Sequence, residues 1–443
     1  MELLKNLSKL FNIVFPFSDF LYILQQEEYS SNRFLYWLPK FFFKRNFQVR
    51  DSLKFTKRVK VTLALSVFFF FIDIALLYFF KLWILIPLNL LLIPLYVLLS
   101  NFILNYYYDF VKSGVRKEAS AIRDSISNLK VVTVAGSYGK TTVKNFIYQL
   151  SKYSYKTQMI PGNINTPTGI AIWIKNNLQK DTELLISEVD SFVIDEIGKS
   201  TRILKPDIAV LTNIGDQHLV RFRDQDELAR ALSETFVYSK EQADLISTKV
   251  VFERLSDVAL GKRNKHEVTM TEIKNDLSES NKMNLAFALK ACEILNVEQR
   301  FIDDALSKLE LPERRQRLTK VFGFDGIDDS YNISFTTSQA GIKEARKQAD
   351  KLNKKLLIVT AGIPELSNEN KDKNFELGKI LKESADFTIV LRSDLSNDII
   401  KGLVGSNFVV LKDFKTFVQK EVNNFEKEEW FILMQPELND LYY

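Results

Sequence analysis

The sequence predicts an α/β protein preceded by an α-helical membrane hairpin. Two apolar runs, residues 61–80 and 84–104, are each long enough to cross a bilayer. From residue 130 onward, short apolar runs alternate with helix-patterned segments, as in a parallel sheet covered by helices. A glycine-rich turn joins the first of these runs to the first helical segment. At 443 residues, the chain has room for two or three domains.

Composition excludes several classes of protein. Charged residues make up 26% of the chain and hydrophobic residues 46%, which is ordinary for a globular protein. The 35 Phe and 16 Tyr are concentrated near the N-terminus, so they indicate a membrane segment rather than an unusual core. The one cysteine, Cys292, excludes a disulfide framework and a thiolate metal cluster. The net charge of +5 comes largely from basic residues beside the apolar runs and gives no reason to expect nucleic acid as a partner.

The first sixty residues mix aromatic and basic side chains. Residues 21–24, 33–38 and 41–45 carry this mixture, which is typical of helices that lie in a membrane interface. We therefore expect a separate element on the cytoplasmic leaflet, in contact with membrane lipid.

The two apolar runs are separated only by Lys81, Leu82 and Trp83, so they are expected to form a tight hairpin with Trp83 at the far interface. Asp73 lies within the first run and should pair inside the hairpin or with a partner helix. Basic residues flank the hairpin: Lys40, Lys44, Arg45, Arg50, Lys54, Lys57, Arg58 and Lys60 before it, and Lys112, Arg116 and Lys117 after it. This charge distribution predicts a multi-pass protein of the cell (inner) membrane with both termini and the remaining domains in the cytoplasm. A hairpin that starts sixty residues into the chain does not fit a cleaved signal peptide.

The pattern divides the chain into four parts. Residues 1–110 form the membrane block, 111–129 a charged connector, 130–311 a central α/β domain and 312–443 a C-terminal α/β domain. Strands are expected at residues 131–135, 184–189, 208–213, 356–360, 387–391, 408–411 and 430–434. Helices are expected between them, for example at residues 226–239, 281–295 and 337–352.

The glycine turn predicts a phosphate-binding loop. It reads Gly136, Ser137, Tyr138, Gly139, Lys140, Thr141, Thr142 and stands between the strand of residues 131–135 and a helical segment. Backbone N–H groups and the helix dipole favour a phosphate there, Lys140 can reach the β- and γ-phosphates, and a threonine hydroxyl can ligate Mg²⁺. Val134 stands where the usual spacing has a glycine, so this is a shortened form of the motif. The central domain is accordingly predicted to be a P-loop-type ATPase domain with ATP and Mg²⁺ as cofactors.

Two further polar residues follow expected strands. Glu188 ends the run that starts at residue 184, and His218 lies just after the run that starts at residue 208. In an open α/β sheet, ligands bind at the carboxyl ends of the strands. Thr141, Glu188 and His218 are therefore expected to converge there and to hold Mg²⁺ at ATP.

Taken in order, these segments resemble the Mur ligase superfamily. Besides the glycine turn, Glu188 and residues 213–219, the resemblance includes residues 162–169 (Gly-Asn-Ile-Asn-Thr-Pro-Thr-Gly) and residues 281–286, where Ser280 replaces the family's histidine. It also includes residues 312–315 (Pro-Glu-Arg-Arg) and residues 328–332 (Asp-Asp-Ser-Tyr-Asn). The last segment is most similar to the branch that adds D-alanyl-D-alanine to a UDP-N-acetylmuramoyl tripeptide.

The resemblance implies an ATP-dependent carbon–nitrogen ligase of peptidoglycan precursor synthesis. A substrate carboxylate would become an acyl phosphate, and an amine would then displace the phosphate. It implies a role for each matching residue: Lys140 at the β- and γ-phosphates, Thr141 and Glu188 at one Mg²⁺, His218 at a second Mg²⁺, Asn284 at the adenine, Arg314 or Arg315 at the phosphates, and Asp329 and Asn332 at the nucleotide. The last two would come from a Rossmann-like C-terminal domain that closes over the site.

Departures from the family pattern concern the second metal and the substrate. Leu232 aligns with a lysine that relatives carry as a carbamate, so water or a nearby carboxylate such as Glu234 is expected to fill the gap. Residues 333–335 read Ile-Ser-Phe where the branch has Ala-Asn-Pro. The membrane block stands in place of the domain that binds the UDP-sugar in the family, so a UDP-linked and a lipid-linked precursor both stay open.

Three functions stay open from the sequence. The first is a membrane-anchored Mur-type ligase that joins a muropeptide precursor to an amino acid or dipeptide amine. The second keeps this chemistry but amidates a lipid-linked precursor, with a partner amidotransferase, or builds a poly-γ-glutamyl polymer. The third is a nucleotide-binding membrane scaffold without ligase activity.

Overall fold

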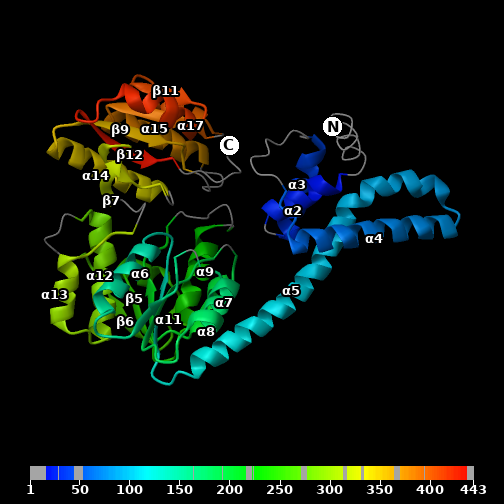
Figure 1. The fold of residues 1–443 in the computed structure, drawn as a ribbon, viewed down its shortest axis with the longest axis horizontal. Coiled ribbons are helices and arrows are strands. Elements are labelled where there is room, and N and C mark those ends of the chain that lie inside the picture. Colours follow the sequence, from blue (N-terminus) through cyan, green and yellow to red (C-terminus); the bar gives the residue numbers. More distant parts are fainter. Residues whose placement is uncertain are drawn as a thin grey trace. The chain divides into compact units, whose positions relative to one another are not determined.

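The computed structural model divides into two compact units, Met1–Gly114 and Val115–Tyr443. It describes residues 16–27, 29–43, 53–162, 164–191, 193–215, 222, 224–270, 277–312, 317–330, 334–363, 370–393 and 395–436. Figure 1 labels the helices and strands of both units.

The first unit is helical. It contains α2 (Phe17–Gln26), α3 (Ser31–Phe43), α4 (Lys57–Phe79), the 3₁₀ helix η1 (Trp83–Leu92) and the start of α5 (Ile93–Asp124). Two segments, Lys57–Phe79 and Trp83–Asp124, are each long enough and apolar enough to cross a membrane. Large apolar side chains on them, such as Phe71, Phe79 and Ile84, are exposed. Apart from residue 80, the two predicted apolar runs fall within these two segments.

The second apolar segment differs from the expected single α-helix. It begins as the 3₁₀ helix η1 and becomes α-helical only from Ile93. Pro87 and Pro94 explain this, because proline lacks the N–H that an α-helix interior requires. The charged segment expected to be a connector is helical as far as Asp124, since α5 continues through it.

Polar contacts join the two legs of the hairpin. The Tyr96 hydroxyl donates to Asp73 Oδ2 at 2.8 Å, and the Ser66 and Ser100 hydroxyls lie 3.1 Å apart. The prediction that Asp73 pairs within the hairpin is thereby confirmed. The apolar face of α2, including Phe20 and Leu24, packs in the same core as Phe70. We expected this region to be separate from the hairpin, but α2 shares an apolar core with it. The expected position of α2 on the cytoplasmic leaflet stays a prediction.

The second unit begins with a six-stranded parallel sheet in the order β2-β3-β1-β4-β5-β6. The strands are β1 (Lys130–Ala135), β2 (Thr157–Met159), β3 (Leu184–Glu188), β4 (Ile208–Leu211), β5 (Asp244–Ser247) and β6 (Asn264–Glu267). The helices are α6 (Lys140–Ser151), α7 (Pro167–Asn177), α8 (Glu196–Leu204), α9 (Gln225–Val237), α10 (Lys249–Arg254), α11 (Asp257–Leu260), α12 (Glu279–Ile294) and α13 (Gln299–Ser307).

Alternating side chains of β1 enter two cores, one on each face of this sheet. Val131 and Ala135 pack with residues of α7, α8 and α9, whereas Val132 and Val134 pack with residues of α6, α12 and α13. The last turns of α5 join the first of these cores through Ala119. A sheet buried on both faces explains why its central strands read as continuous apolar runs.

A second six-stranded sheet has the order β11-β10-β9-β12-β8-β7. Its strands are β7 (Arg317–Val321), β8 (Phe324–Asp328), β9 (Lys355–Thr360), β10 (Phe387–Leu391), β11 (Phe408–Leu411) and β12 (Trp430–Gln435). Strand β7 is antiparallel to β8, and the other pairs are parallel. The helices are α14 (Phe335–Lys351), α15 (Asn370–Ser384), α16 (Ser396–Leu403) and α17 (Phe414–Thr416), followed by the short turns Phe417–Glu421 and Val422–Asn424.

The predicted mixed α/β class with parallel sheets is confirmed. All seven expected strands are present, and five more, β2, β5, β6, β7 and β8, were missed. Strand β6 was missed because it is an edge strand of sequence Asn-Lys-His-Glu, without an apolar run. The hairpin β7–β8 turns at Phe322 and Gly323, both with positive φ, and its sequence lacks the usual Asn-Gly signal.

Candidate functional site

The glycine turn lies at the carboxyl end of β1 and leads directly into α6. Gly136 and Gly139 have φ values of 137° and 82°, which other residues rarely adopt. A Cβ at Gly136 would stand 2.1 Å from Thr212 Oγ1, and one at Gly139 would stand 2.4 Å from Asn284 Oδ1. Both positions therefore need glycine for their backbone angles and for the close approach of a neighbouring side chain.

The end of β4 orders this turn. The side-chain oxygen of Asn213 accepts hydrogen bonds from the N–H groups of Ser137 and Tyr138, each at 3.1 Å. The Thr212 hydroxyl donates to Tyr138 O at 2.6 Å, and Gly215 N–H donates to Ser137 Oγ at 2.8 Å. The turn is thus held in shape by two neighbouring strands before any ligand binds.

Lys140, the first residue of α6, folds back over the turn. Its Nζ donates to Gly136 O at 2.7 Å and lies 3.2 Å from Asp190 Oδ2. Asp190 follows β3 by two residues and is not among the predicted site residues. The ammonium group of Lys140 that Asp190 contacts is the group predicted to bind the γ-phosphate. Asp190 would therefore compete with the phosphate for Lys140.

Replacing Asp190 with asparagine should therefore tighten nucleotide binding. We expect the Kd of a non-hydrolysable ATP analogue to fall about threefold to tenfold, since the loss of one competing ion pair is worth roughly 1 kcal/mol. Titration calorimetry measures this directly. Asp181→Asn, which removes an exposed acid paired with Lys156, is the matched control. Weaker binding in Asp190→Asn would contradict the competition and would instead make Asp190 a part of the nucleotide site.

Thr141 and Glu188 lie together, as expected. The Thr141 hydroxyl donates to Glu188 Oε2 at 2.8 Å, and the ammonium of Lys144 lies 3.8 Å from the same oxygen. Glu188 is buried at the end of β3. Among the described residues, no hydrogen bond or ion pair reaches its second oxygen, Oε1. A hydroxyl and a carboxylate are hard oxygen donors, so these two residues fit a divalent cation such as Mg²⁺.

The described part of the chain contains no group of three His, Cys, Asp or Glu side chains that could hold a metal by themselves. His218, the predicted ligand of a second cation, lies outside the described residues, as do Arg314, Arg315 and Asn332. Their roles stay predictions.

Two of the remaining predicted residues lie on helices that cover the first sheet, and one follows a strand of the second sheet. Thr142 is buried in the first turn of α6. Asn284, on α12, places its side-chain oxygen against Gly139 and donates to Asn281 Oδ1 at 3.3 Å. It thus borders the phosphate loop, and its predicted contact with adenine stays a prediction. Asp329 follows β8 in the second sheet, where Oδ2 accepts from Gln435 Nε2 at 3.1 Å.

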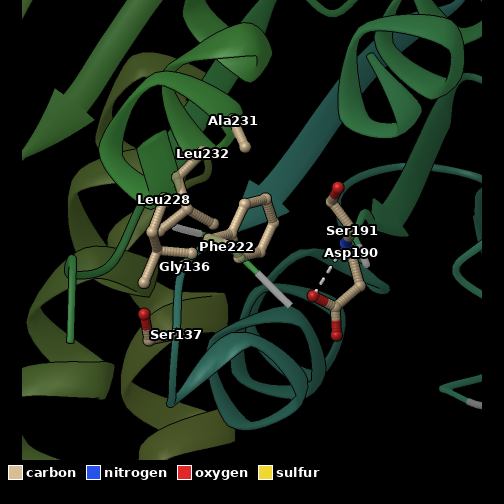
Figure 2. A pocket seen from close by; sticks show the side chains of 8 residues that line it. All are labelled: Gly136, Ser137, Asp190, Ser191, Phe222, Leu228, Ala231 and Leu232. Atoms are coloured by element: carbon tan, nitrogen blue, oxygen red, sulfur yellow. Dashed lines mark hydrogen bonds between the residues drawn. The ribbon is translucent and has the colours of Figure 1, made fainter. Parts of the chain in front are cut away.

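A small pocket adjoins the loop. It is lined by Gly136, Ser137, Asp190, Ser191, Phe222, Leu228, Ala231 and Leu232. Figure 2 shows Leu228, Leu232 and Phe222 gathered on one side and Asp190 and Ser191 on the other. Leu232 thus faces the pocket beside the phosphate loop, where an apolar side chain offers nothing to a cation.

Glu234 does not fill the gap that Leu232 leaves. Its two carboxylate oxygens accept hydrogen bonds from the N–H groups of Asp195 and Gly198, each at 2.7 Å, at the start of α8. Burial raises the pKa of the Glu234 carboxyl, although these two amide bonds act in the opposite direction. The expectation that Glu234 serves the metal is corrected: its oxygens are committed to the α8 N-terminus, which a carboxylate stabilises.

Sequence reasoning missed two charged residues of the site, Asp190 and Lys144. The signals that could have found them are spacings. Lys144 follows Lys140 by four residues, which places both on one face of α6. Asp190 follows Glu188 by two residues, which points their side chains the same way when the strand geometry continues.

Comparison with known proteins agrees with this geometry. Residues 134–303 match the family model of the Mur ligase middle domain. The chain is 27% identical over 256 residues to the UDP-N-acetylmuramoyl-tripeptide–D-alanyl-D-alanine ligase of Bacillus subtilis (strain 168), covering 52% of this chain and 55% of that protein. It is 22% identical to the protein of the same name from Borreliella burgdorferi, covering 69% of this chain and 68% of the relative. The chain thus spans only about half the length of the Bacillus protein.

A solved structure shares the fold. MurF ligase from Thermotoga maritima in complex with ADP matches with a TM-score of 0.62 at 22% identity, covering 74% of this chain and 80% of that one. At this identity the match supports the arrangement of sheets and helices, and it leaves the chemistry to be argued from the residues.

Proposed function

We propose that the chain is an ATP-dependent amide ligase of peptidoglycan precursor synthesis and a member of the Mur ligase superfamily, whose middle-domain model matches residues 134–303. Its relatives and its fold favour the branch that adds D-alanyl-D-alanine to a muramoyl tripeptide. The observation that carries the proposal is the juxtaposition of Lys140, Thr141 and Glu188 at the carboxyl ends of β1 and β3.

The proposed reaction has two steps. An oxygen of the substrate carboxylate forms a bond to the γ-phosphorus of ATP while ADP leaves, which gives an acyl phosphate. An amine nitrogen then bonds to the acyl carbon, loses a proton and releases phosphate. Two anions meet in the first step, so positive charge at the site lowers the barrier.

The chain supplies that charge in defined places. Lys140 would exchange Asp190 for the β- and γ-phosphates, and Thr141 with Glu188 would hold the cation. When bound, Mg²⁺ would neutralise negative charge on the phosphates. The Asn213 side chain fixes the backbone of the glycine turn, which would hold this loop in place beside the phosphates.

The apolar helices of the first unit support a membrane location. We propose that α4 and the segment Trp83–Leu104 form a transmembrane hairpin of the cell membrane, with both termini and the ligase domains in the cytoplasm. The substrate would then be a muropeptide precursor, UDP-linked or lipid-linked, that is used at the membrane face. A partner amidotransferase belongs to the amidating alternative.

One experiment separates these possibilities. The full-length protein in detergent or lipid nanodiscs is given ATP and Mg²⁺ with muramoyl tripeptide acceptors, either UDP-linked or lipid-linked, and with D-alanyl-D-alanine, glutamate or ammonia as the amine. ADP release that depends on an acceptor supports a ligase, and the product mass identifies the amine. ADP release without any dependence on acceptor or amine would overturn the ligase proposal and favour a nucleotide-binding scaffold.

Bicarbonate should not change the rate of ADP release. Carbamate formation needs a lysine amine, and Leu232 stands in the pocket where relatives are implied to carry that lysine. We expect equal turnover with bicarbonate removed by degassing and with bicarbonate added. An increase with bicarbonate, or a carbamylated lysine found in this pocket, would show that the alignment of Leu232 is wrong.

A further inference from the structure

Lys144 is a fully buried lysine in the middle of the candidate site. It lies one helical turn after Lys140 on α6 and has no exposed surface. Its Nζ donates to the carbonyl oxygen of Ile160 at 2.9 Å and lies 3.8 Å from Glu188 Oε2. A buried ammonium group is stable only when it is paired and hydrogen-bonded, and both kinds of partner are present here.

The contacts of Glu188 are one-sided. Thr141 Oγ1 and Lys144 Nζ both approach Oε2, whereas no described residue donates a hydrogen bond to Oε1. One oxygen is therefore held by the protein, and the other is left for a ligand. This is the arrangement in which an outer group orients a ligating carboxylate.

Lys144 also connects β3 to the loop after β2. Ile160 and Gly162 belong to that loop, and a Cβ at Gly162 would stand 3.5 Å from Lys144 Nζ and 3.4 Å from Thr141 Cγ2. The loop thus passes directly beside both α6 side chains. A single ammonium group links helix α6, the carboxylate of β3 and the backbone of the loop.

Lys140 and Lys144 of α6 have different partners. Lys140 pairs with Asp190 beside the pocket and can exchange this partner for a phosphate. Lys144 pairs with Glu188, is also bonded to a backbone carbonyl, and has no exposed surface.

We propose that Lys144 is a positioning residue of the metal site: it holds Glu188 through Oε2 and the Ile160 carbonyl so that Oε1 faces the cation. The inference rests on the proposed function only in taking Glu188 as a metal ligand. Loss of an outer-shell partner commonly weakens metal binding 10- to 100-fold. It should do so here without changing the affinity for metal-free ADP.

The test measures metal binding without turnover. The full-length protein with ADP is titrated with Mn²⁺, and free Mn²⁺ is followed by electron paramagnetic resonance. Lys144→Met keeps the length and apolar stem of the side chain but removes its charge, and we expect Mn²⁺ to bind about 10- to 100-fold more weakly. Lys152→Met, which changes an exposed lysine after α6, should match the unsubstituted protein.

A second variant keeps the test decisive if Lys144→Met does not fold. Lys144→Gln retains an N–H donor for the Ile160 carbonyl and lacks the charge, so it should fold and still bind Mn²⁺ more weakly. Unchanged Mn²⁺ affinity in a folded Lys144 variant would overturn the proposal and leave Lys144 as an ordinary core residue. No Mn²⁺ binding by the unsubstituted protein would overturn it too. Normal Mn²⁺ binding and weakened variants, together with no ligase activity, would sustain this inference while the proposed function failed.

Discussion

Replacing Lys140 with alanine is expected to lower acceptor-dependent ADP release by about 10³-fold, because the variant loses the charge that faces the transferred phosphate. The fold should survive, since the Lys140 side chain contacts the loop carbonyls and Asp190 and belongs to neither apolar core of the sheet. The measurement is steady-state ADP release by full-length protein in detergent. Thermal unfolding of the same preparation reports on the fold.

Two further variants interpret the result for Lys140. Lys152→Ala, an exposed lysine beyond the same helix, should retain full activity. The double variant Lys140→Ala with Asp190→Asn removes the acid that the single variant leaves without its lysine, so it should recover any lost thermal stability but no activity. Near-normal ADP release by a folded Lys140→Ala protein would refute the assignment of the phosphate loop.

Cysteine labelling should place the turn of the hairpin outside the cell. A cysteine at position 81 is expected to react with a membrane-impermeant maleimide added to intact cells, and a cysteine at position 128 is not. Lys81 and Asn128 are both exposed, so access depends on the side of the membrane and not on burial. The basic residues on the outer flanks of the two apolar segments provide the physical reason.

The native thiol does not interfere with this test. Cys292 is buried in α12, and burial raises the pKa of its thiol to about 12, so little thiolate is present near neutral pH. After permeabilisation, position 128 should label as strongly as position 81. Labelling of position 128 but not position 81 in intact cells would reverse the proposed topology, and protection of both in intact cells would argue against a transmembrane hairpin.

Elements that are buried on both faces could be predicted from the sequence. Strands β1, β3, β4, β9, β10 and β12 are interior strands of their sheets and read as apolar runs. Strands β2, β6 and β7 lie at sheet edges, where part of the surface is open to water and the pattern is weak. Strand β5 neighbours the polar edge strand β6 and is only four residues long.

Part of the candidate site could be predicted in the same way. The geometry of the glycine turn could be predicted from the sequence. Glycines between a buried strand and a helix start indicate positive φ, and both glycines of this turn have it. Glu188 ends β3, and Thr141 lies in the first turn of α6 just after β1, so both are expected at the carboxyl edge of the sheet. The ion pair between Lys140 and Asp190 could not be predicted, because the sequence does not distinguish an aspartate on the surface from an aspartate in a binding site.

The sequence by itself determined the properties that depend on short-range pattern: the α/β class, most of the interior strands, the phosphate loop and the two apolar segments. Such patterns are local because helix and strand periods and glycine φ preferences act within a few residues. Only the tertiary structure decided which charges meet. Glu234 lies on the same helix as Leu232, yet its oxygens cap α8. Lys144, by contrast, reaches Glu188 across 44 residues of chain. Partners of buried charges are set by packing across the whole sheet, because each buried polar group must find its hydrogen bond wherever the fold provides one.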